Sequence, residues 1–159
     1  MEIRISISRQ TLALWNDAGS LLHVWSVSTA ARGAGEMAGS FQTPRGRHVI
    51  RARISAGQPL NAVFKARRPT GEVYSDALAA AFPGRDWILT RILWLSGCEP
   101  GFNRLGTCDT MRRYIYIHGT PDTEPMGVPA SHGCIRMRNR DLVELFDLVP
   151  ALTPVVIEA

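Results

Sequence analysis

The sequence has very little lysine, few cysteines and no long apolar run. Lys65 is the only lysine, so nearly all of the positive charge behind the formal net charge of +4 comes from arginine. Arginine binds carboxylates and phosphates through a planar set of donors. The charge therefore suits an acidic small substrate or, equally, a solvated arginine-rich surface. The aromatic residues do not alternate with basic ones in a stacking pattern, so no nucleic-acid partner is expected.

The absence of long apolar runs excludes a membrane-spanning helix, which needs roughly 20 apolar residues. The first residues, Met1-Glu2-Ile3-Arg4-Ile5, alternate apolar and polar as a strand does. They lack the basic start and apolar stretch of a secretory signal. These features predict a cytoplasmic protein, or a periplasmic one if a leader precedes this sequence.

The three cysteines are Cys98, Cys108 and Cys134, and an odd number leaves at least one free thiol. Cys98 and Cys108 flank a loop that contains proline, glycine and asparagine. They could form a disulfide in an oxidising compartment and would stay thiols in a reducing one. Both interpretations stay open at this point.

The pattern of apolar residues predicts a mainly β domain with two short helices. No linker or repeat divides the chain, so one domain over residues 1–159 is expected. Alternation of apolar and polar residues indicates strands, and apolar spacing with a cap and a stop indicates helices. The predicted strands are 1–7, 10–15, 21–28, 47–54, 87–95, 113–117 and 155–157; the predicted helices are 75–82, capped by Ser75, and 139–149, capped by Asn139.

The residues that can carry chemistry gather between positions 114 and 138. A predicted strand ends in His118-Gly119, a loop rich in proline and glycine follows, and a Ser-His-Gly triplet leads into Cys134. A cysteine thiol is mostly unionised at neutral pH, and a histidine within reach can take its proton during attack on a carbonyl. The loop allows the two to meet, so Cys134 is predicted as nucleophile and His118 as its base.

Two further features of this region would assist the reaction. No Asp or Glu stands beside His118 in the sequence, so a backbone carbonyl, such as that of Gly119, is expected to orient the ring. Gly133 would let the backbone approach the substrate closely. Its N–H and that of Cys134 could form an oxyanion hole, where loss of one donor typically costs about 2.7–4 kcal/mol of barrier.

A tetrahedral metal site is the competing interpretation. His118, His132, Cys134 and the distant Cys108 are suitable ligand types. Zinc sites usually take two ligands from a short element with two to five residues between the ligands. Only His132 and Cys134 are close, and a single residue separates them. No metal and no other cofactor is therefore expected.

The run Ser131-His132-Gly133-Cys134-Ile135-Arg136-Met137, with His118-Gly119 before it, resembles the signature of the L,D-transpeptidase catalytic domain, the YkuD-type family. The turn Thr43-Pro44-Arg45-Gly46 and the Val-Ser-Thr segment at 27–29 resemble further parts of that family, so the resemblance covers nearly the whole chain. Ala30 departs from it, because a glycine often follows the Ser-Thr pair.

The resemblance implies a β-sandwich-like fold and action on peptidoglycan stem peptides or muropeptides. In this family the cysteine attacks the carbonyl of an L-centre, usually of a diaminopimelate, that precedes a terminal D-alanine. D-alanine leaves and a thioester remains. An amine acceptor then gives a 3–3 cross-link, and water gives L,D-carboxypeptidase activity. Acylation of the cysteine by a carbapenem is also implied.

Carried onto this chain, the resemblance assigns roles to individual residues. Cys134 is the nucleophile, His118 the base and acid, and His132 a supporting residue, while Gly133 and Cys134 supply oxyanion N–H groups. The residues expected to contact substrate are Gly119, Ser131 and Arg136, of which Arg136 would either brace the loop or meet a substrate carboxylate.

Hydrolysis is the preferred outcome, because no signal peptide and no separate wall-binding domain is seen. A short cytoplasmic member would trim the terminal D-alanine from soluble muropeptides during recycling. Wall cross-linking and an idle peptidoglycan-binding module are the alternatives. Residues 56–72, with Lys65, Arg67 and Arg68, are either a basic rim for a substrate carboxylate or a solvated loop. The acceptor, the preferred stem-peptide length and the oligomeric state are not indicated.

Overall fold

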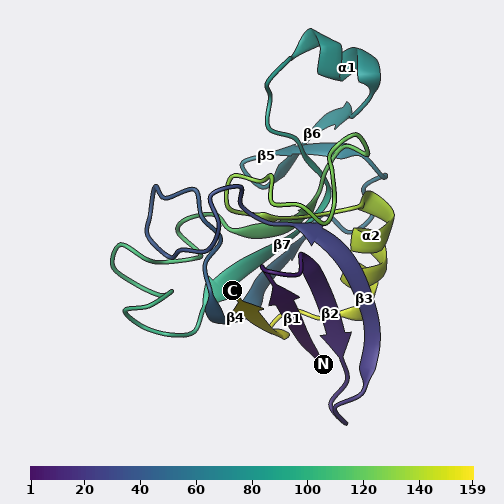
Figure 1. Cartoon of the computed structure of the whole chain (residues 1–159). Coiled ribbons are helices and arrows are strands. Elements are labelled where there is room, and N and C mark those ends of the chain that lie inside the picture. The colour runs from purple at the N-terminus through teal and green to yellow at the C-terminus, as the bar shows by residue number, and fades with distance from the viewer.

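A computed structural model describes the whole chain, residues 1–159, as one sheet of ten strands with two helices (Figure 1). The strands are β1 (Glu2–Ser6), β2 (Thr11–Trp15), β3 (Leu21–Ser28), β4 (Gly46–Ile54), β5 (Ala62–Lys65), β6 (Arg68–Val73), β7 (Ile88–Gly97), β8 (Tyr116–Gly119), β9 (Ile135–Met137) and β10 (Pro154–Glu158). Their order is β4-β10-β1-β2-β3-β9-β8-β7-β5-β6, and β4 also pairs with β7. Eight strands therefore close into a ring, and the β5–β6 hairpin branches outside it.

The ring closes around a core because its strands carry apolar residues at every second position. In β1, Ile3 and Ile5 are buried while Arg4 between them is exposed. Helix α2 (Asn139–Leu148) packs against β7 and β8 and adds Leu145 and Phe146 to the same cluster. Burial of such apolar surface contributes about 25 cal/mol per Å² and is the main stabilising term of the fold.

The pairing of β8 with β9 positions the predicted catalytic residues. These two strands are parallel neighbours, with Ile117 opposite Ile135 and His118 opposite Arg136. Parallel neighbours need a connection that crosses back over the sheet, and here residues 120–134 provide it. The backbone N–H groups of Ala130 and Ser131 both donate to Thr29 O, which fixes the end of this loop beside β3.

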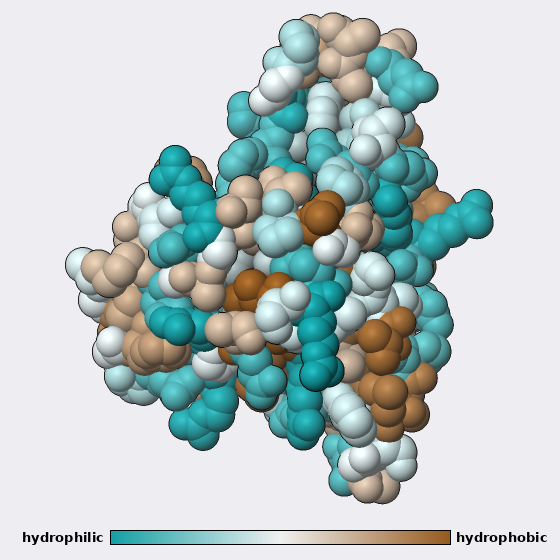
Figure 2. Space-filling model, in the orientation of Figure 1, coloured by the Kyte–Doolittle hydropathy of each residue, from teal (hydrophilic) through white to brown (hydrophobic).

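The hairpin of β5 and β6 and helix α1 (Asp76–Ala81) form a unit that stands above the ring in Figure 1 and is seen in profile in Figure 2. Ser75 caps α1 as predicted, because its Oγ accepts from Leu78 N at 3.1 Å. The helix buries none of its residues completely. Neither α1 nor α2 is long and apolar enough to cross a membrane.

The predicted fold class, mainly β with two short helices, is confirmed, but several boundaries differ. β8 begins at Tyr116 rather than at Arg113, because residues 111–114 form a turn in which Tyr114 has a φ of 56°. β5 and β6 fall in the segment expected to be a rim or loop, and β9 was not expected at all.

The predicted cap of α2 is also wrong. The cap position is Arg138, without a side-chain cap bond, and Asn139 is the first helical residue. The Asn139 amide instead donates to Thr120 O at 2.9 Å and to Asn61 Oδ1 at 3.0 Å, and its oxygen accepts from Thr90 Oγ1 at 2.7 Å. This buried residue therefore ties the helix to the chain that follows β8.

Candidate active site

The side chains of Cys134 and His118 open into one cavity of about 460 Å³. Their common orientation follows from strand register, because residues two apart share a face and Cys134 stands next to Tyr116 across the β8–β9 pair. The Tyr116 N–H donates to Cys134 Sγ at 3.3 Å, which confirms this neighbourhood. Tyr116 and His118 of β8 and Cys134 and Arg136 of the facing chain all line the cavity.

The Cys134 thiol is held in its protonated form. Burial raises the pKa of the thiol to about 12, and the hydrogen bond from Tyr116 N–H offsets only part of that effect. The Sγ–H donates to Tyr114 O at 3.4 Å. Because almost no thiolate exists at neutral pH, attack on a carbonyl requires a base that removes the proton during the reaction.

His118 is placed and polarised to be that base. Its side chain is 2% exposed, and its Nδ1 lies 2.6 Å from Gly119 O. A carbonyl only accepts, so Nδ1 carries the proton and Nε2 keeps a lone pair. Burial lowers the pKa of the imidazole below its usual value of 6.5, which keeps the ring neutral at pH 7. The expectation that the Gly119 carbonyl orients this ring is confirmed.

The loop before Cys134 is shaped by two hydroxyl groups. Ser131 Oγ donates to Cys134 O at 2.5 Å and accepts from Gly133 N at 3.2 Å. Thr43 Oγ1 donates to Gly133 O at 2.9 Å and accepts from Ala30 N at 3.0 Å. The Thr-Pro-x-Gly turn therefore holds the nucleophile loop through Thr43. Sequence analysis did not predict this contact between the two segments.

Both glycines of the predicted site have structural roles. Gly133 has a φ of 134°, which favours glycine, and a Cβ there would lie 3.3 Å from Ile115 Cδ1. Its N–H is already bonded to Ser131 Oγ, so the oxyanion role predicted for it is not preformed. Gly119 is buried and does not line the cavity, and a Cβ there would clash with Asn139 Oδ1, so its substrate contact stays a prediction.

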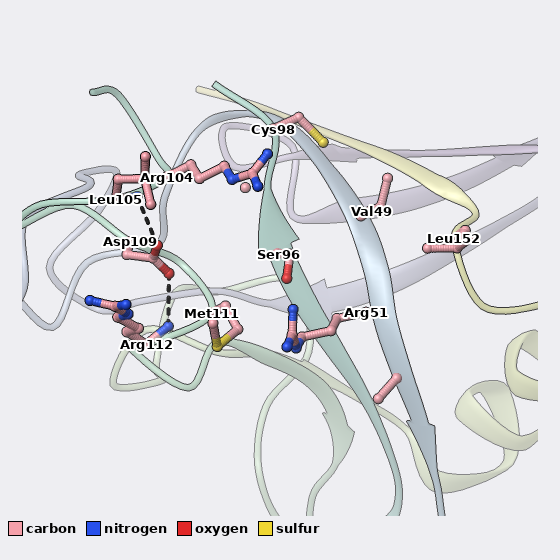
Figure 3. A pocket seen from close by; sticks show the side chains of 12 residues that line it. Val49, Arg51, Ser96, Cys98, Arg104, Leu105, Asp109, Met111, Arg112 and Leu152 are labelled. Atoms are coloured by element: carbon pink, nitrogen blue, oxygen red, sulfur yellow. Dashed lines mark hydrogen bonds between the residues drawn. The ribbon is translucent and has the colours of Figure 1, made fainter. Parts of the chain in front are cut away.

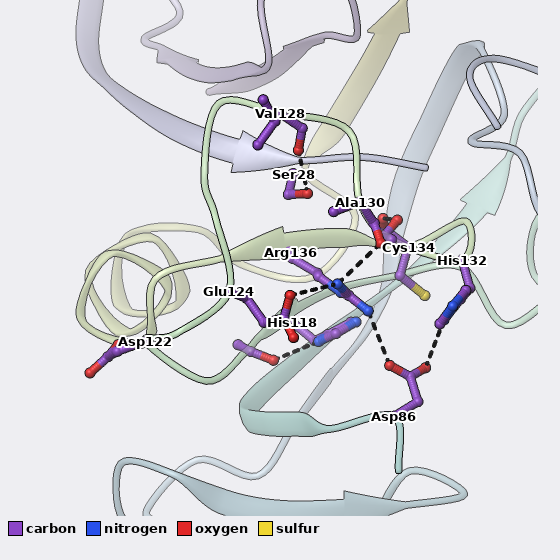
Figure 4. Close-up of polar contacts among 12 residues, drawn as sticks. Ser28, Asp86, His118, Asp122, Glu124, Val128, Ala130, His132, Cys134 and Arg136 are labelled. Carbon is purple, nitrogen blue, oxygen red and sulfur yellow. Dashed lines mark hydrogen bonds and ion pairs between the residues drawn. The ribbon is translucent and has the colours of Figure 1, made fainter. Parts of the chain in front are cut away.

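Asp86 joins two of the predicted residues at the mouth of the cavity (Figure 4). Its Oδ1 lies 3.2 Å from Arg136 Nη2, and its Oδ2 lies 3.7 Å from Nδ1 of His132. Arg136 also reaches Glu124 Oε2 at 3.6 Å and Ala130 O at 3.3 Å, and its side chain is 8% exposed. Of the two roles predicted for Arg136, these contacts favour bracing of the loop.

Asp86 was missed because it lies far along the chain, in the segment between α1 and β7. Its charge acts against the burial that lowers the pKa of His118. Arg113 lies close to His118 in the sequence, but its role was missed because its partners lie more than 70 residues away. Its guanidinium donates to Gly35 O at 3.2 Å and Gln42 O at 2.6 Å, which fixes residues 35–42, whose Gln42 O lies near Gly133. No local pattern signals either contact.

The remaining cysteines and the competing metal site lie outside this arrangement. Cys98 and Cys108 are free thiols, and Cys98 lines a second, larger cavity of about 520 Å³ (Figure 3). That cavity contains neither Cys134 nor a histidine, so size alone does not identify the chemistry. No group of three or more His, Cys, Asp or Glu side chains is arranged to hold a metal ion. The metal interpretation thus lacks its ligand set.

Comparison with known proteins gives one consistent match. Residues 1–157 match the family model of the L,D-transpeptidase catalytic domain, YkuD. The protein named "Putative L,D-transpeptidase YkuD" from Bacillus licheniformis is 46% identical over 46 residues, which are 29% of this chain and 28% of that protein. The aligned region therefore covers less than a third of that curated relative.

Solved structures show the same fold. The chain is similar to an L,D-transpeptidase from Mycobacterium smegmatis, with a TM-score of 0.57, 19% identity, and coverage of 99% of this chain and 58% of that one. L,D-transpeptidase 3 from Mycobacterium tuberculosis matches with a TM-score of 0.60 and 16% identity over 99% of this chain and 60% of that one. Because the family model covers almost every residue, the chain belongs to the YkuD-type L,D-transpeptidase catalytic-domain family.

Proposed function

We propose that the chain is a cysteine acyl-transfer enzyme that removes the terminal D-alanine from peptidoglycan stem tetrapeptides, as an L,D-carboxypeptidase in muropeptide recycling. The observation that carries the proposal is the shared cavity of Cys134 and His118. One side chain is a protonated thiol, and the other is a neutral imidazole with a free Nε2. Membership of the L,D-transpeptidase catalytic-domain family supports a peptidoglycan stem peptide as the substrate.

The reaction balances on these two side chains. As Cys134 Sγ attacks the carbonyl that precedes D-alanine, its proton passes to His118 Nε2 and the carbonyl oxygen becomes an oxyanion. The C–N bond then breaks, His118 returns the proton to the leaving amine, and a thioester remains. Water attacks the thioester while His118 takes its proton, the thiol leaves protonated, and the tripeptide carboxylate is released.

The backbone N–H of Cys134 is the proposed oxyanion donor. The other predicted donor, Gly133 N–H, is held by Ser131 Oγ at 3.2 Å and would have to exchange that partner to contribute. In this arrangement Ser131 shapes the loop and His132, whose side chain is 65% exposed, lies at the cavity mouth beside Asp86. The site therefore depends on one donor and one base rather than on a charged pair.

Transpeptidation is the second candidate, and the names of the relatives favour it. The same thioester would then be opened by an amine acceptor to give a 3–3 cross-link. The thioester itself is common to both outcomes. A carbapenem would acylate Cys134 in either case.

Incubation with a disaccharide-tetrapeptide, followed by mass spectrometry, tests the proposal, with Cys134→Ala as the control. The proposal predicts a tripeptide and free D-alanine that are absent from the control. If dimers joined by 3–3 cross-links are detected instead, the activity is transpeptidation and not hydrolysis. If no reaction occurs at all, the proposed enzymatic function is wrong and the chain is a peptidoglycan-binding module on this fold. A cytoplasmic location is part of the proposal, and cell fractionation tests it.

A further inference from the structure

The rim of the catalytic cavity carries a guanidinium group without a counter-ion. Arg67 lines the cavity together with Cys134 and His118 and is half-buried. No Asp or Glu oxygen of the chain lies within 4 Å of it. Arg136, the other arginine of the cavity, has two such carboxylates. Arginine binds carboxylates through paired donors, so a guanidinium without a carboxylate partner beside the nucleophile is suited to receive an anion.

Aromatic rings hold the Arg67 guanidinium in place. Its central carbon lies 4.8 Å from the centroid of Trp94 and 4.7 Å from that of Tyr114. Its Nη1 donates to Tyr116 OH at 3.1 Å. Cation–π contacts hold the charge over the rings without using the N–H donors, which stay available for a planar ligand. No other hydrogen bond engages the group, so most of its donors are unused.

The turn between β5 and β6 directs this side chain inward. Ala66 and Arg67 both have positive φ values, 48° and 65°, which non-glycine residues rarely adopt outside tight hairpins. The neighbouring cations Lys65 and Arg68 are exposed and do not line the cavity. One arginine of the predicted basic segment is thus selected for the cavity, and its neighbours are left in solvent.

Tyr116 fixes the spacing between this group and the nucleophile. Its backbone N–H contacts Cys134 Sγ, and its phenol oxygen contacts Arg67 at the far end of the side chain. Burial raises the pKa of the phenol, so it stays protonated and can donate or accept. The thiol and the guanidinium therefore contact opposite ends of the same residue, which separates the nucleophile from the charged group.

We propose that Arg67 is a substrate-binding residue whose guanidinium binds a carboxylate of the donor stem peptide, one that lies away from the scissile bond. The inference rests on the proposed function and names a part of the substrate that the site recognises. The interaction is a charge-assisted, two-donor contact of the kind arginine makes with carboxylates. It orders the peptide along the cavity and raises affinity without entering the chemical step.

Two measurements with tetrapeptides test this assignment. Release of D-alanine gives KM and kcat, and calorimetric titration of the Cys134→Ala protein gives the dissociation constant without turnover. The peptides are the free tetrapeptide and derivatives in which one carboxylate at a time is converted to an amide. Arg67→Gln is compared with Arg68→Gln, the exposed neighbour in the same hairpin, and with Arg67→Lys, which keeps the charge and loses the planar fork.

Arg67→Gln is expected to raise KM and the dissociation constant by roughly 10- to 100-fold, with kcat near that of the parent. Arg68→Gln should behave as the parent, and Arg67→Lys should lie between. Amidation of one particular carboxylate should weaken binding to the parent by a similar factor and add nothing in Arg67→Gln, because both changes remove the same contact. A purely structural role of Arg67 would weaken all peptides alike.

The outcomes separate this inference from the proposed function. Normal turnover with unchanged affinity in Arg67→Gln overturns the inference and leaves the function standing. Specific weakening in Arg67→Gln without any turnover by the parent supports the inference and overturns the function. Absence of peptide binding to the Cys134→Ala protein overturns both.

Discussion

Two buried histidines, His48 and His118, lie on different strands of the same ring in nearly the same local setting. Each directs Nδ1 at a backbone carbonyl, of Gly46 at 3.0 Å for His48 and of Gly119 at 2.6 Å for His118. Burial lowers the pKa of both, that of His48 to about 4. Of the two, sequence analysis assigned a catalytic role to His118 alone, on the residues that follow it in the chain.

The difference lies at the second ring nitrogen. Nε2 of His48 is bonded to Thr110 Oγ1 at 3.0 Å, so both of its nitrogens are satisfied within the fold. Nε2 of His118 has no such partner, and the ring lines the cavity that contains Cys134. Burial and a lowered pKa therefore do not identify a catalytic histidine. A catalytic histidine is identified by a ring nitrogen without a hydrogen-bond partner, in a cavity that also contains a nucleophile.

Replacement of each histidine by asparagine should give the largest difference in activity between the two sites. The asparagine amide can take the place of Nδ1 and donate to the same carbonyl, while Nε2 is lost in both variants. His118→Asn should lower kcat for D-alanine release by about 10²- to 10⁴-fold, the usual contribution of a general base. His48→Asn should keep kcat close to that of the parent wherever the protein is folded. Equal losses in the two variants would remove the distinction.

Acid should lower the free energy of unfolding through protonation of His48. Its pKa is about 4 in the folded protein and near 6.5 when unfolded, so the unfolded chain binds the extra proton first as pH falls. Stability from this residue is complete above pH 6.5 and is lost between about pH 6.5 and 4, by roughly 3 kcal/mol. Denaturant unfolding of the parent and His48→Asn across this range checks it, and parallel stability curves would contradict it.

A smaller effect is expected where the nucleophile loop meets the Thr-Pro-x-Gly turn. Thr43→Val keeps the shape of the buried side chain but leaves Ala30 N–H and Gly133 O without their partner. The free energy of unfolding should fall by about 1–3 kcal/mol, and kcat should fall less than in His118→Asn. Thermal unfolding measures the change in stability, and D-alanine release measures the change in kcat. An unchanged stability would show that the hydroxyl does not hold the loop.

The sequence predicted well what depends on local pattern. Alternation gave β3 with the bounds that the structure has, Leu21–Ser28, and the capping serine gave α1. The β5–β6 hairpin was missed because its turn, Ala66-Arg67, has positive φ values without the glycine or asparagine that would signal them. β9 has three residues, too few for an alternating pattern to show.

The site divides in the same way. Cys134, His118 and the Gly119 carbonyl were predictable because their residue types and glycine-rich neighbours lie within one short segment of the chain, residues 118–134. Asp86 and Thr43 reach the site from segments far away, and only the closed ring brings them there. Local sequence identifies reacting groups, whereas the groups that hold them come from tertiary contacts.

The most direct test of the account is the rate at which a carbapenem acylates Cys134, followed by intact-protein mass spectrometry. The parent and His48→Asn should gain one adduct at similar rates, Cys134→Ala should gain none, and His118→Asn should react at least about 100-fold more slowly. Acylation of His118→Asn as fast as the parent would contradict the assignment of His118 as the base, and an adduct on Cys134→Ala would contradict Cys134 as the nucleophile.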